Sequence, residues 1–419
     1  MILVSPDCLS TSSSSMLFSR NPMLSSHLCF TIRRRTFRTK TSRRLCVASS
    51  LITSPESFEV GRLIGSYGFM NITSYSAGGM DFEYSGGQLK LQDVGEGSVK
   101  IRLYEGRIAQ GSLRGTPVVF KVYPGQRAGG IEADMMAANE LNAHAALQSS
   151  SKGACQNLLM LVGGFETKTG EQVCYTSGLL FVMVGNIVQQ TMQNLLVKKF
   201  QKSISTKETS WNHFEQEQKI KRRRYFVIKL LQGAITGLAY MHYHDRLHQS
   251  LGPSSVVLNT IAEREAPYLV PRLRDLAFSV DMRISNLEDG LGTLSEGLWR
   301  RAIAAGASTP MEKRAFGIAD DIYEAGLLLA YLAFVPFCEA GIVDTLSLQR
   351  LLENTFRLDV EAMREYCLAD DRLEEAVKFL DLGDRAGWQL LQAMLNPDFR
   401  KRPIAEAVLK HRFMIGAVV

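Results

Sequence analysis

Two charged residues of this chain stand in apolar surroundings, where each could bind a charged ligand. Lys121 lies within the run VVFKVY, and its apolar neighbours favour a functional lysine over a solvated lysine on a strand surface. Asp275 lies in the segment RDLAF, in a loop that follows an apolar stretch. A carboxylate at such a place is a hard oxygen ligand of the kind that Mg²⁺ prefers, although an aspartate that caps a turn fits the same pattern. Both residues are therefore candidates for a charged site.

The elements around these candidates follow a definite order. A helix is predicted over residues 225–242, with an apolar stripe that consists of Ile228, Leu231, Ile235 and Leu238. The helix leads into the tight loop HQSLGPSS at residues 248–255, then into a short pair of strands, and then into the loop of Asp275. The rest of the chain is organised around this succession.

This succession resembles the large lobe of a protein kinase, whose catalytic loop is usually written HRDLKPxN. His248, Leu251 and Pro253 keep the frame of that loop. Ser250, however, stands where the family has its catalytic aspartate, and Ser255 stands where it has a metal-binding asparagine. A serine hydroxyl carries no negative charge at neutral pH, so it cannot accept the substrate proton as the aspartate does. The resemblance implies an α+β, bilobal fold with a small β-rich N-lobe, a larger mostly helical C-lobe and a damaged phosphoryl-transfer site.

The resemblance also implies nucleotide-binding roles in the small lobe. Lys121 matches the strand lysine that holds the nucleotide phosphates. Gly106 matches the last glycine of the phosphate-covering loop, and Gly95 and Gly97 serve as its other glycines if the hairpin is longer than usual. The earlier run FEVGRLIGSYGF indicates an N-terminal strand or hairpin rather than that loop, because no suitable lysine follows it at strand spacing.

A second helix is predicted over residues 130–148, with an apolar face formed by Ile131, Met135, Ala138, Leu141 and Ala145. The resemblance implies that this helix supplies a glutamate that pairs with Lys121. Glu140 is placed best for that role and Glu132 is second, while a surface glutamate on an amphipathic helix is the alternative. Two further strands are expected at residues 158–165 and 179–184, the second of which leads into the hinge between the lobes.

Other positions match structural elements of the kinase large lobe. Asp275 takes the place of the metal-binding aspartate of the Asp-Phe-Gly element, although the two residues after it differ from the family. Asp321 and Gly326 match the long buried helix whose aspartate ties the backbone of the catalytic loop in place. Arg402 stands where the family has its structural arginine. Residues 309–312 are the nearest remnant of the Ala-Pro-Glu element.

Residues 1–50 differ from the rest of the chain in charge and composition. They contain eight Lys/Arg and one acid, Asp7, so they carry about +7, which leaves the other residues near −1 of the net charge of +6. The positive excess of the whole chain therefore gives no support for nucleic-acid binding. The segment is rich in Ser and Thr and resembles a chloroplast transit peptide that ends near residue 47, with a disordered basic tail as the alternative.

Two more stretches bear on partners. Residues 325–343 are mostly apolar and about long enough to span a membrane, but Pro336, Glu339 and the flanking Glu324 favour a core helix. The basic run KIKRRR at residues 219–224 predicts a solvated face, with an interaction loop as the alternative. We expect no transmembrane span, while peripheral contact with a membrane surface is left open.

These observations predict four parts of the chain. They are a transit peptide (1–47), an N-terminal extension (48–87), a kinase-like N-lobe (88–186) and a kinase-like C-lobe (187–419). The predicted function is that of a pseudokinase, which scaffolds or regulates an unidentified protein partner. Residual binding of ATP and Mg²⁺ is assigned to Lys121, Glu140 and Asp275.

Two alternatives remain at this point. The first is an active Ser/Thr kinase with an atypical catalytic loop, for which His248 or Asp245 would supply the base. The second is an unrelated membrane-associated protein that uses residues 325–343. The kinase spacing of Asp321 and Gly326 argues against the second alternative, because a membrane span does not require these two residues.

Overall fold

The computed structural model describes residues 51–69, 99–124, 126–149, 155–166, 179–184, 213–283, 295–338 and 342–415. Several features that the sequence predicts lie in other parts of the chain. The predicted transit peptide, Gly95, Gly97 and the predicted hinge beyond residue 184 lie outside the described residues.

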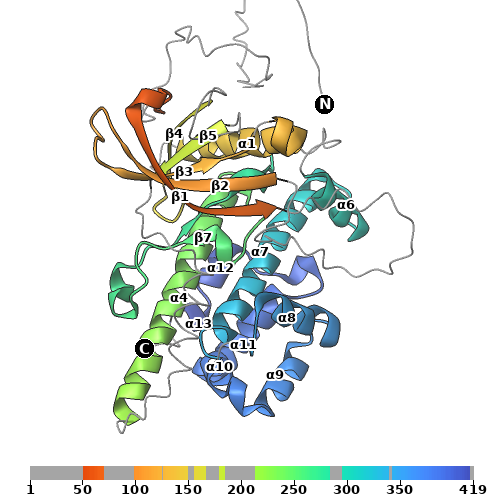
Figure 1. Cartoon of the computed structure of the whole chain (residues 1–419). Helices are drawn as coiled ribbons and strands as arrows, with labels where there is room; N and C mark the ends of the chain where they lie inside the picture. The colour runs from red at the N-terminus through yellow and green to blue at the C-terminus, as the bar shows by residue number, and fades with distance from the viewer. Residues whose placement is uncertain are drawn as a thin grey trace, which may run out of the picture. The chain divides into compact units, whose positions relative to one another are not determined.

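The small lobe contains a five-stranded antiparallel sheet in the order β1-β2-β3-β5-β4 (Figure 1). The strands are β1 (Phe58–Phe69), β2 (Val99–Ile108), β3 (Pro117–Val122), β4 (Leu161–Glu166) and β5 (Leu179–Val184). The bounds of β5 are those that the sequence predicted. The strand expected at residues 158–165 begins later, because Leu158 instead forms an isolated bridge with Leu273 in the large lobe.

Strand β1 lies in the segment that we expected to be an extension ahead of the small lobe. It pairs with β2 from Phe58, opposite Ile108, to Phe69, opposite Val99. The ring of Phe58 also packs edge-on against Phe120 of β3, at 5.8 Å between centroids. Part of residues 48–87 therefore belongs to the sheet, and the expected start of the lobe at residue 88 is too late.

Helix α1 (Gln126–Gln148) packs beside the sheet and begins four residues before the predicted start. Its buried face differs from the predicted one. The buried side chains of the helix are Ala133, Met136, Ala137, Glu140, Ala143, His144 and Leu147. The face is rotated because it includes two polar residues, Glu140 and His144, which a count of apolar spacings passes over.

The large lobe is mostly helical (Figure 1). It also contains two short two-stranded sheets. Its helices are α4 (His213–Tyr243), α6 (Glu296–Ala304), α7 (Pro310–Phe334), α8 (Thr345–Arg350), α9 (Val360–Leu368), α10 (Glu374–Leu380), α11 (Leu382–Met394), α12 (Ala405–Leu409) and α13 (Arg412–Ile415). A π-helical turn at Leu351–Thr355 follows α8. The whole predicted stripe of α4 is buried, at Ile228, Leu231, Ile235 and Leu238.

Helix α7 is the buried helix that Asp321 and Gly326 predicted. Residues 309–312, which we compared with the Ala-Pro-Glu element, form its N-terminal capping box. The Thr309 hydroxyl accepts the Glu312 N–H, and the Glu312 carboxylate accepts the Thr309 N–H. Gly326 lies close to α11: a Cβ there would lie 2.7 Å from a methyl of Leu395, which would have to shift.

The apolar stretch 325–343 lies partly in α7, where residues 328–334 are buried in the core of the large lobe. This placement explains its hydrophobicity. Among the helices of the described residues, we find none with the length and apolar character needed to cross a bilayer.

Helix α4 starts twelve residues before the predicted helix and contains the basic run 219–224. Lys219 and Lys221 are exposed, as expected for a solvated face. Arg223 is not: it is buried, its Nε lies 3.3 Å from Glu263, and its Nη1 donates to the Pro336 carbonyl at 2.9 Å. The run is therefore a helix face with one structural arginine.

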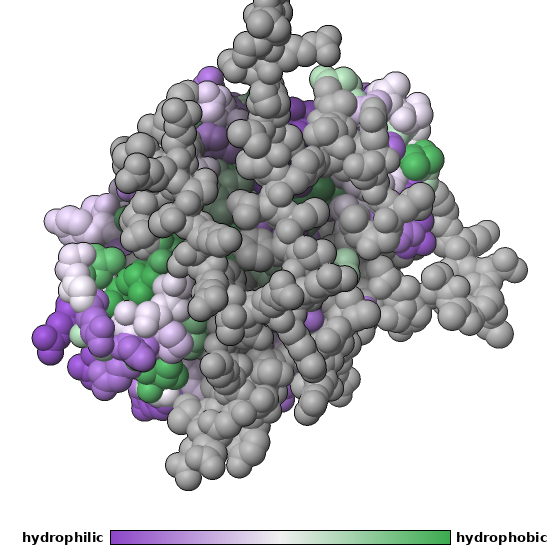
Figure 2. Space-filling model, turned by 90° about the horizontal axis from the view of Figure 1, so that it is seen from above, coloured by the Kyte–Doolittle hydropathy of each residue, from purple (hydrophilic) through white to green (hydrophobic). Residues whose placement is uncertain are grey.

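The described surface of the small lobe carries a few large apolar side chains, namely Leu51, Leu63, Ile64, Leu113 and Met160. Seen from above, apolar residues lie among hydrophilic ones (Figure 2).

Candidate functional site

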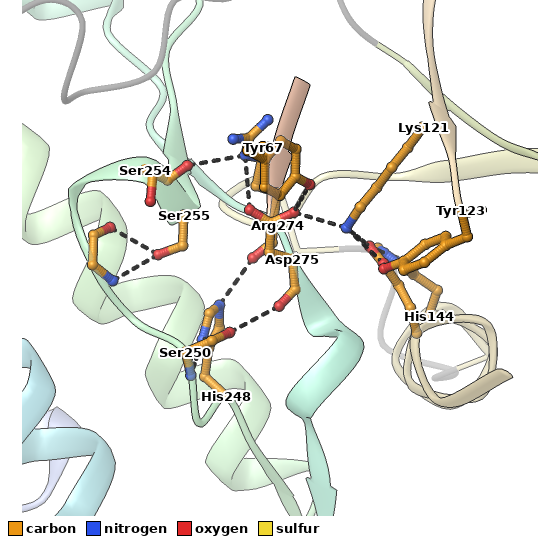
Figure 3. A network of polar contacts seen from close by, with 12 residues as sticks. Tyr67, Lys121, Tyr123, His144, His248, Ser250, Ser254, Ser255, Arg274 and Asp275 are labelled. Carbon is orange, nitrogen blue, oxygen red and sulfur yellow. Dashed lines mark hydrogen bonds and ion pairs between the residues drawn. The ribbon is translucent and has the colours of Figure 1, made fainter. Parts of the chain in front are cut away.

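Two short sheets hold the catalytic-loop segment close to Asp275. Strand β6 (Arg246–Leu247) pairs with β9 (Val280–Asp281), and β7 (Val256–Val257) pairs with β8 (Arg272–Leu273). The first pair fixes the chain just before the loop and the second fixes it just after. Because β8 leads directly to Asp275, the loop and the acid lie side by side (Figure 3).

Asp321 of α7 holds the backbone of the catalytic-loop segment in place through hydrogen bonds. Its carboxylate accepts the N–H groups of His248 and Gln249 at 2.8 and 2.9 Å, and also the Gln249 side-chain amide at 3.0 Å. His242 Nε2 lies 2.9 Å from the same carboxylate. Gln249 has a φ of 59°, which a non-glycine residue rarely adopts. The carboxylate thus stabilises a backbone conformation that the loop alone would not favour.

His248 and Ser250 make structural contacts within the loop. His248 is fully buried, and its Nε2 lies 3.0 Å from the Arg274 carbonyl. Because a carbonyl only accepts, Nε2 carries the proton and Nδ1 is the acceptor. The Ser250 hydroxyl donates to the Asp275 carbonyl at 3.0 Å and lies 3.4 Å from His248 Nδ1. At the position of the family's catalytic aspartate, this chain has a neutral group bound to its own backbone.

The structure brings Lys121, Glu140 and Asp275 together. Lys121 extends from β3, and its Nζ donates to the two Glu140 oxygens at 3.0 and 2.7 Å and to Asp275 Oδ1 at 2.8 Å. All three side chains are almost completely buried. The partner of Lys121 on α1 is thus Glu140 rather than the second candidate, Glu132.

All three groups are charged at neutral pH. Burial alone would raise the pKa of Asp275, but Arg274 and Lys121 outweigh it and lower this pKa to about 2. Burial would likewise raise the pKa of Glu140, yet Lys121 and His144 lower it. Burial acts to lower the pKa of Lys121, and the neighbouring Asp275 and Glu140 raise it above its usual range. The ion pairs therefore persist inside the protein.

Three members of this network were missed in the sequence. The Tyr67 hydroxyl donates to Asp275 Oδ1 at 2.6 Å, and the Tyr123 hydroxyl donates to Glu140. Arg274 Nε lies 3.1 Å from Asp275 Oδ2, and the guanidinium covers the Tyr67 ring at 5.1 Å from its centroid (Figure 3). Arg274 could have been noticed as a charge next to Asp275. Tyr67 gave no signal, because it lies on β1, 208 residues before its partner.

The glycine assignments need correction. Gly106 does not lie in a phosphate-covering loop but within β2, opposite Val60 on one side and Val118 on the other. A Cβ there would overlap the Phe120 ring and the Glu59 carbonyl, so packing requires the glycine. The connection between β1 and β2 spans residues 70–98, which include Gly95 and Gly97, outside the described residues.

The residues present do not fit a magnesium ion. Asp275 Oδ1 accepts hydrogen bonds from Lys121 and Tyr67, while Oδ2 is buried, accepts no hydrogen bond within the described residues and faces the Arg274 guanidinium at 3.1 Å, where a second cation would be repelled. Ser255, at the position of the family's asparagine, is buried and exchanges hydrogen bonds of 2.8 and 2.9 Å with the Gly252 backbone. Within the described residues, no three or more His, Cys, Asp or Glu side chains gather into a group that could hold a metal.

Comparisons with known proteins bear on the fold. No protein-family model matches the chain, and no curated protein matches its sequence. Among solved structures, the chain is similar to the crystal structure of a Stt7 homolog from Micromonas algae soaked with ATP. The similarity has a TM-score of 0.53 at 17% sequence identity and covers 90% of this chain and 97% of that chain. With the antiparallel sheet and helical lobe described above, it shows a protein kinase-like, bilobal α+β fold.

Proposed function

We propose that this protein is a pseudokinase: it uses a kinase-like fold to scaffold or regulate a protein partner and does not transfer phosphate through the usual catalytic loop. One observation carries the proposal. Ser250 takes the place of the catalytic aspartate, and its hydroxyl is bound to the Asp275 carbonyl at 3.0 Å. A kinase works by positioning the substrate hydroxyl and neutralising charge. A neutral donor turned toward the backbone does neither.

An active kinase with another base is the competing function. Asp245 is the nearest acid upstream, and its carboxylate forms an ion pair with Arg314 at 2.7 Å. His248 is completely buried and bonded through Nε2 to the Arg274 carbonyl. His248 is thus held in buried structural contacts and Asp245, with a side chain that is 37% exposed, is paired with a cation, which supports the pseudokinase.

Phosphoryl transfer by the full chain tests this choice. The protein is incubated with γ-labelled ATP and Mg²⁺ or Mn²⁺, and label is counted on the protein itself and on generic basic and acidic protein substrates. We expect no incorporation above that of Asp275→Asn, and the same background for Ser250→Ala. Transfer that disappears in Asp245→Asn or His248→Gln, with thermal unfolding unchanged, would instead establish the active kinase.

A plastid location is the second part of the proposal. It is supported by the basic, Ser- and Thr-rich character of residues 1–50. Residues 1–47 fused to a fluorescent protein should direct it into chloroplasts and be removed on import. A fusion that stays in the cytosol would leave the segment as a basic tail without an address.

A further inference from the structure

Arg274 lies against Asp275, the residue that the resemblance assigned to Mg²⁺. Its Nε lies 3.1 Å from Asp275 Oδ2 and also donates to the Ser254 carbonyl at 3.0 Å. Its backbone is fixed as well, because its N–H donates to the Ser255 carbonyl and its own carbonyl contacts His248 Nε2. The guanidinium is thus held rigidly against the carboxylate that the resemblance assigned to Mg²⁺.

A divalent ion at Asp275 would meet two permanent cations. Lys121 Nζ lies 2.8 Å from one carboxylate oxygen, and Arg274 Nε lies 3.1 Å from the other. The two cations are balanced by two carboxylates, Asp275 and Glu140, so the buried network is already neutral. An added ion could reach only Oδ2, which accepts no hydrogen bond from the described residues, and there it would be repelled by Arg274 and Lys121. The other carboxylate of the network, Glu140, accepts from Lys121 through both of its oxygens.

The donors of the two cations differ in availability. An ammonium has three hydrogens, and Lys121 uses all of them on Glu140 and Asp275. Arg274 Nε has one hydrogen, which it donates to the Ser254 carbonyl, and its contact with Asp275 Oδ2 is an ion pair. Within the described part of the chain, neither of its terminal nitrogens has a hydrogen bond, and Figure 3 shows them turned away from the residues drawn. The side chain is 11% exposed, so these nitrogens can be reached by a ligand.

We propose that this site binds a phosphate-bearing ligand without a divalent metal, and that the terminal nitrogens of Arg274 hold the phosphate. A planar guanidinium matches two phosphate oxygens with two parallel N–H groups. It supplies in fixed form the positive charge that the family takes from Mg²⁺. The inference rests on the proposed function in one respect, that the site binds its ligand and does not react with it.

Calorimetric titration of the full chain tests the inference. ATP and inorganic tripolyphosphate are each titrated in EDTA and again in Mg²⁺, and Mg²⁺ is titrated alone. We expect binding in EDTA with a Kd within about threefold of that in Mg²⁺, and no binding of Mg²⁺ alone. Binding of both probes means that the phosphate group suffices, and binding of ATP alone means that the ligand is a nucleotide; either result supports the inference.

Substitutions assign the binding to Arg274. Arg274→Gln should raise the Kd in EDTA by about tenfold or more. The matched control is Arg272→Gln, two residues earlier, whose Nε donates to the Gln156 carbonyl; its Kd should stay within about twofold. If Arg274→Gln does not fold, Arg274→Lys replaces it as the test variant. Lysine keeps the positive charge but lacks the two parallel N–H groups of the guanidinium, so this variant should weaken binding several-fold.

Four results would overturn the inference: no binding of either probe, binding that EDTA abolishes, binding of Mg²⁺ alone, or an unchanged Kd in folded Arg274→Gln. None of these depends on phosphoryl transfer. Label transfer in the kinase assay would refute the proposed pseudokinase and leave metal-free binding to be decided by the titration in EDTA.

Discussion

Replacing Asp321 tests how the loop is held. Its carboxylate lies in the interior of the large lobe and accepts four hydrogen bonds at 2.8 to 3.0 Å. Two of the donors are backbone N–H groups, of His248 and Gln249, and these cannot turn away to find another partner. Asp321→Ala leaves them buried and unsatisfied, while Asp321→Asn keeps one acceptor oxygen and places an amide donor against the remaining donors.

The size of the effect follows from these contacts. A buried donor left without a partner costs roughly 1–3 kcal/mol, and bonds to a charged acceptor are at the upper end. For two backbone donors and two side-chain donors that can partly rearrange, we expect Asp321→Ala to lower the free energy of unfolding by about 4 kcal/mol. Asp321→Asn should lower it by about 2 kcal/mol, because about half of the acceptors remain.

Urea unfolding of the full chain, followed by circular dichroism, measures both variants. The matched control is Asp320→Asn, the preceding residue on α7, whose carboxylate forms an ion pair with Arg301 at 2.6 Å near the surface. This pair should contribute less than about 1 kcal/mol. A loss below about 1 kcal/mol for Asp321→Ala, or one no larger than that of Asp320→Asn, would refute the reasoning.

The pH dependence gives the same prediction a second measurement. Burial alone would raise the pKa of Asp321, but the hydrogen bonds from His242 and the His248 backbone outweigh it and lower the pKa. A carboxylate whose pKa is lowered by folding stabilises the protein fully above its unfolded pKa of about 3.9. This contribution is lost as the pH falls through the folded pKa. The difference between wild type and Asp321→Ala should therefore be constant near neutral pH and shrink below about pH 4.

Two further substitutions test packing and anchoring by the same unfolding measurement. Gly106→Ala should lower the free energy of unfolding by about 2 kcal/mol, because the new Cβ meets the Phe120 ring and the Glu59 carbonyl. The control is Gly65→Ala, which has nothing within 4 Å of its Cβ and should be neutral or slightly stabilising. Equal effects of the two substitutions would contradict the packing argument. Arg402→Lys should lower the free energy of unfolding by about 1–2 kcal/mol. Lysine cannot reproduce the guanidinium that donates to the Asn396 and Ala319 carbonyls at 2.7 and 3.0 Å. The control is Lys401→Arg at the exposed neighbouring position, and an unchanged unfolding midpoint for Arg402→Lys would argue against this anchor.

The features that the sequence predicted well are those whose signal is local. The apolar stripe of α4 lies within eleven residues, and the short spacing of Asp321 and Gly326 marks one helix. The start of α4 was missed, because residues 213–224 are polar and charged. Glu, Gln, Lys and Arg are nevertheless good helix formers, so low hydrophobicity was a poor guide to where the helix begins.

The rest of the site depends on contacts that sequence spacing does not carry. Tyr67 reaches Asp275 only because β1 joins the sheet beside β2, across the long connection 70–98. The assignment of Gly106 followed the family pattern, whereas its position is decided by the Phe120 ring beneath it. Glu140 was found from the resemblance, but its burial rotates α1 away from the face that apolar spacing indicated.

The buried charges of this structure fall into two groups: some hold the fold of the large lobe, and others form the candidate site. Asp321 and Arg402 bind backbone groups of the large lobe, so the lobe requires them whatever ligand is present. In the candidate site, Lys121 and Arg274 are matched by Glu140 and Asp275, so the network that links β3, α1 and the loop after β8 is neutral without a ligand. Because the network is electrically neutral, its ion pairs are stable without a metal. An anion can bind only to donors that make no hydrogen bond within the network. The terminal nitrogens of Arg274 meet that condition, which is why the residue that was absent from the sequence-based assignment becomes the one on which ligand binding depends.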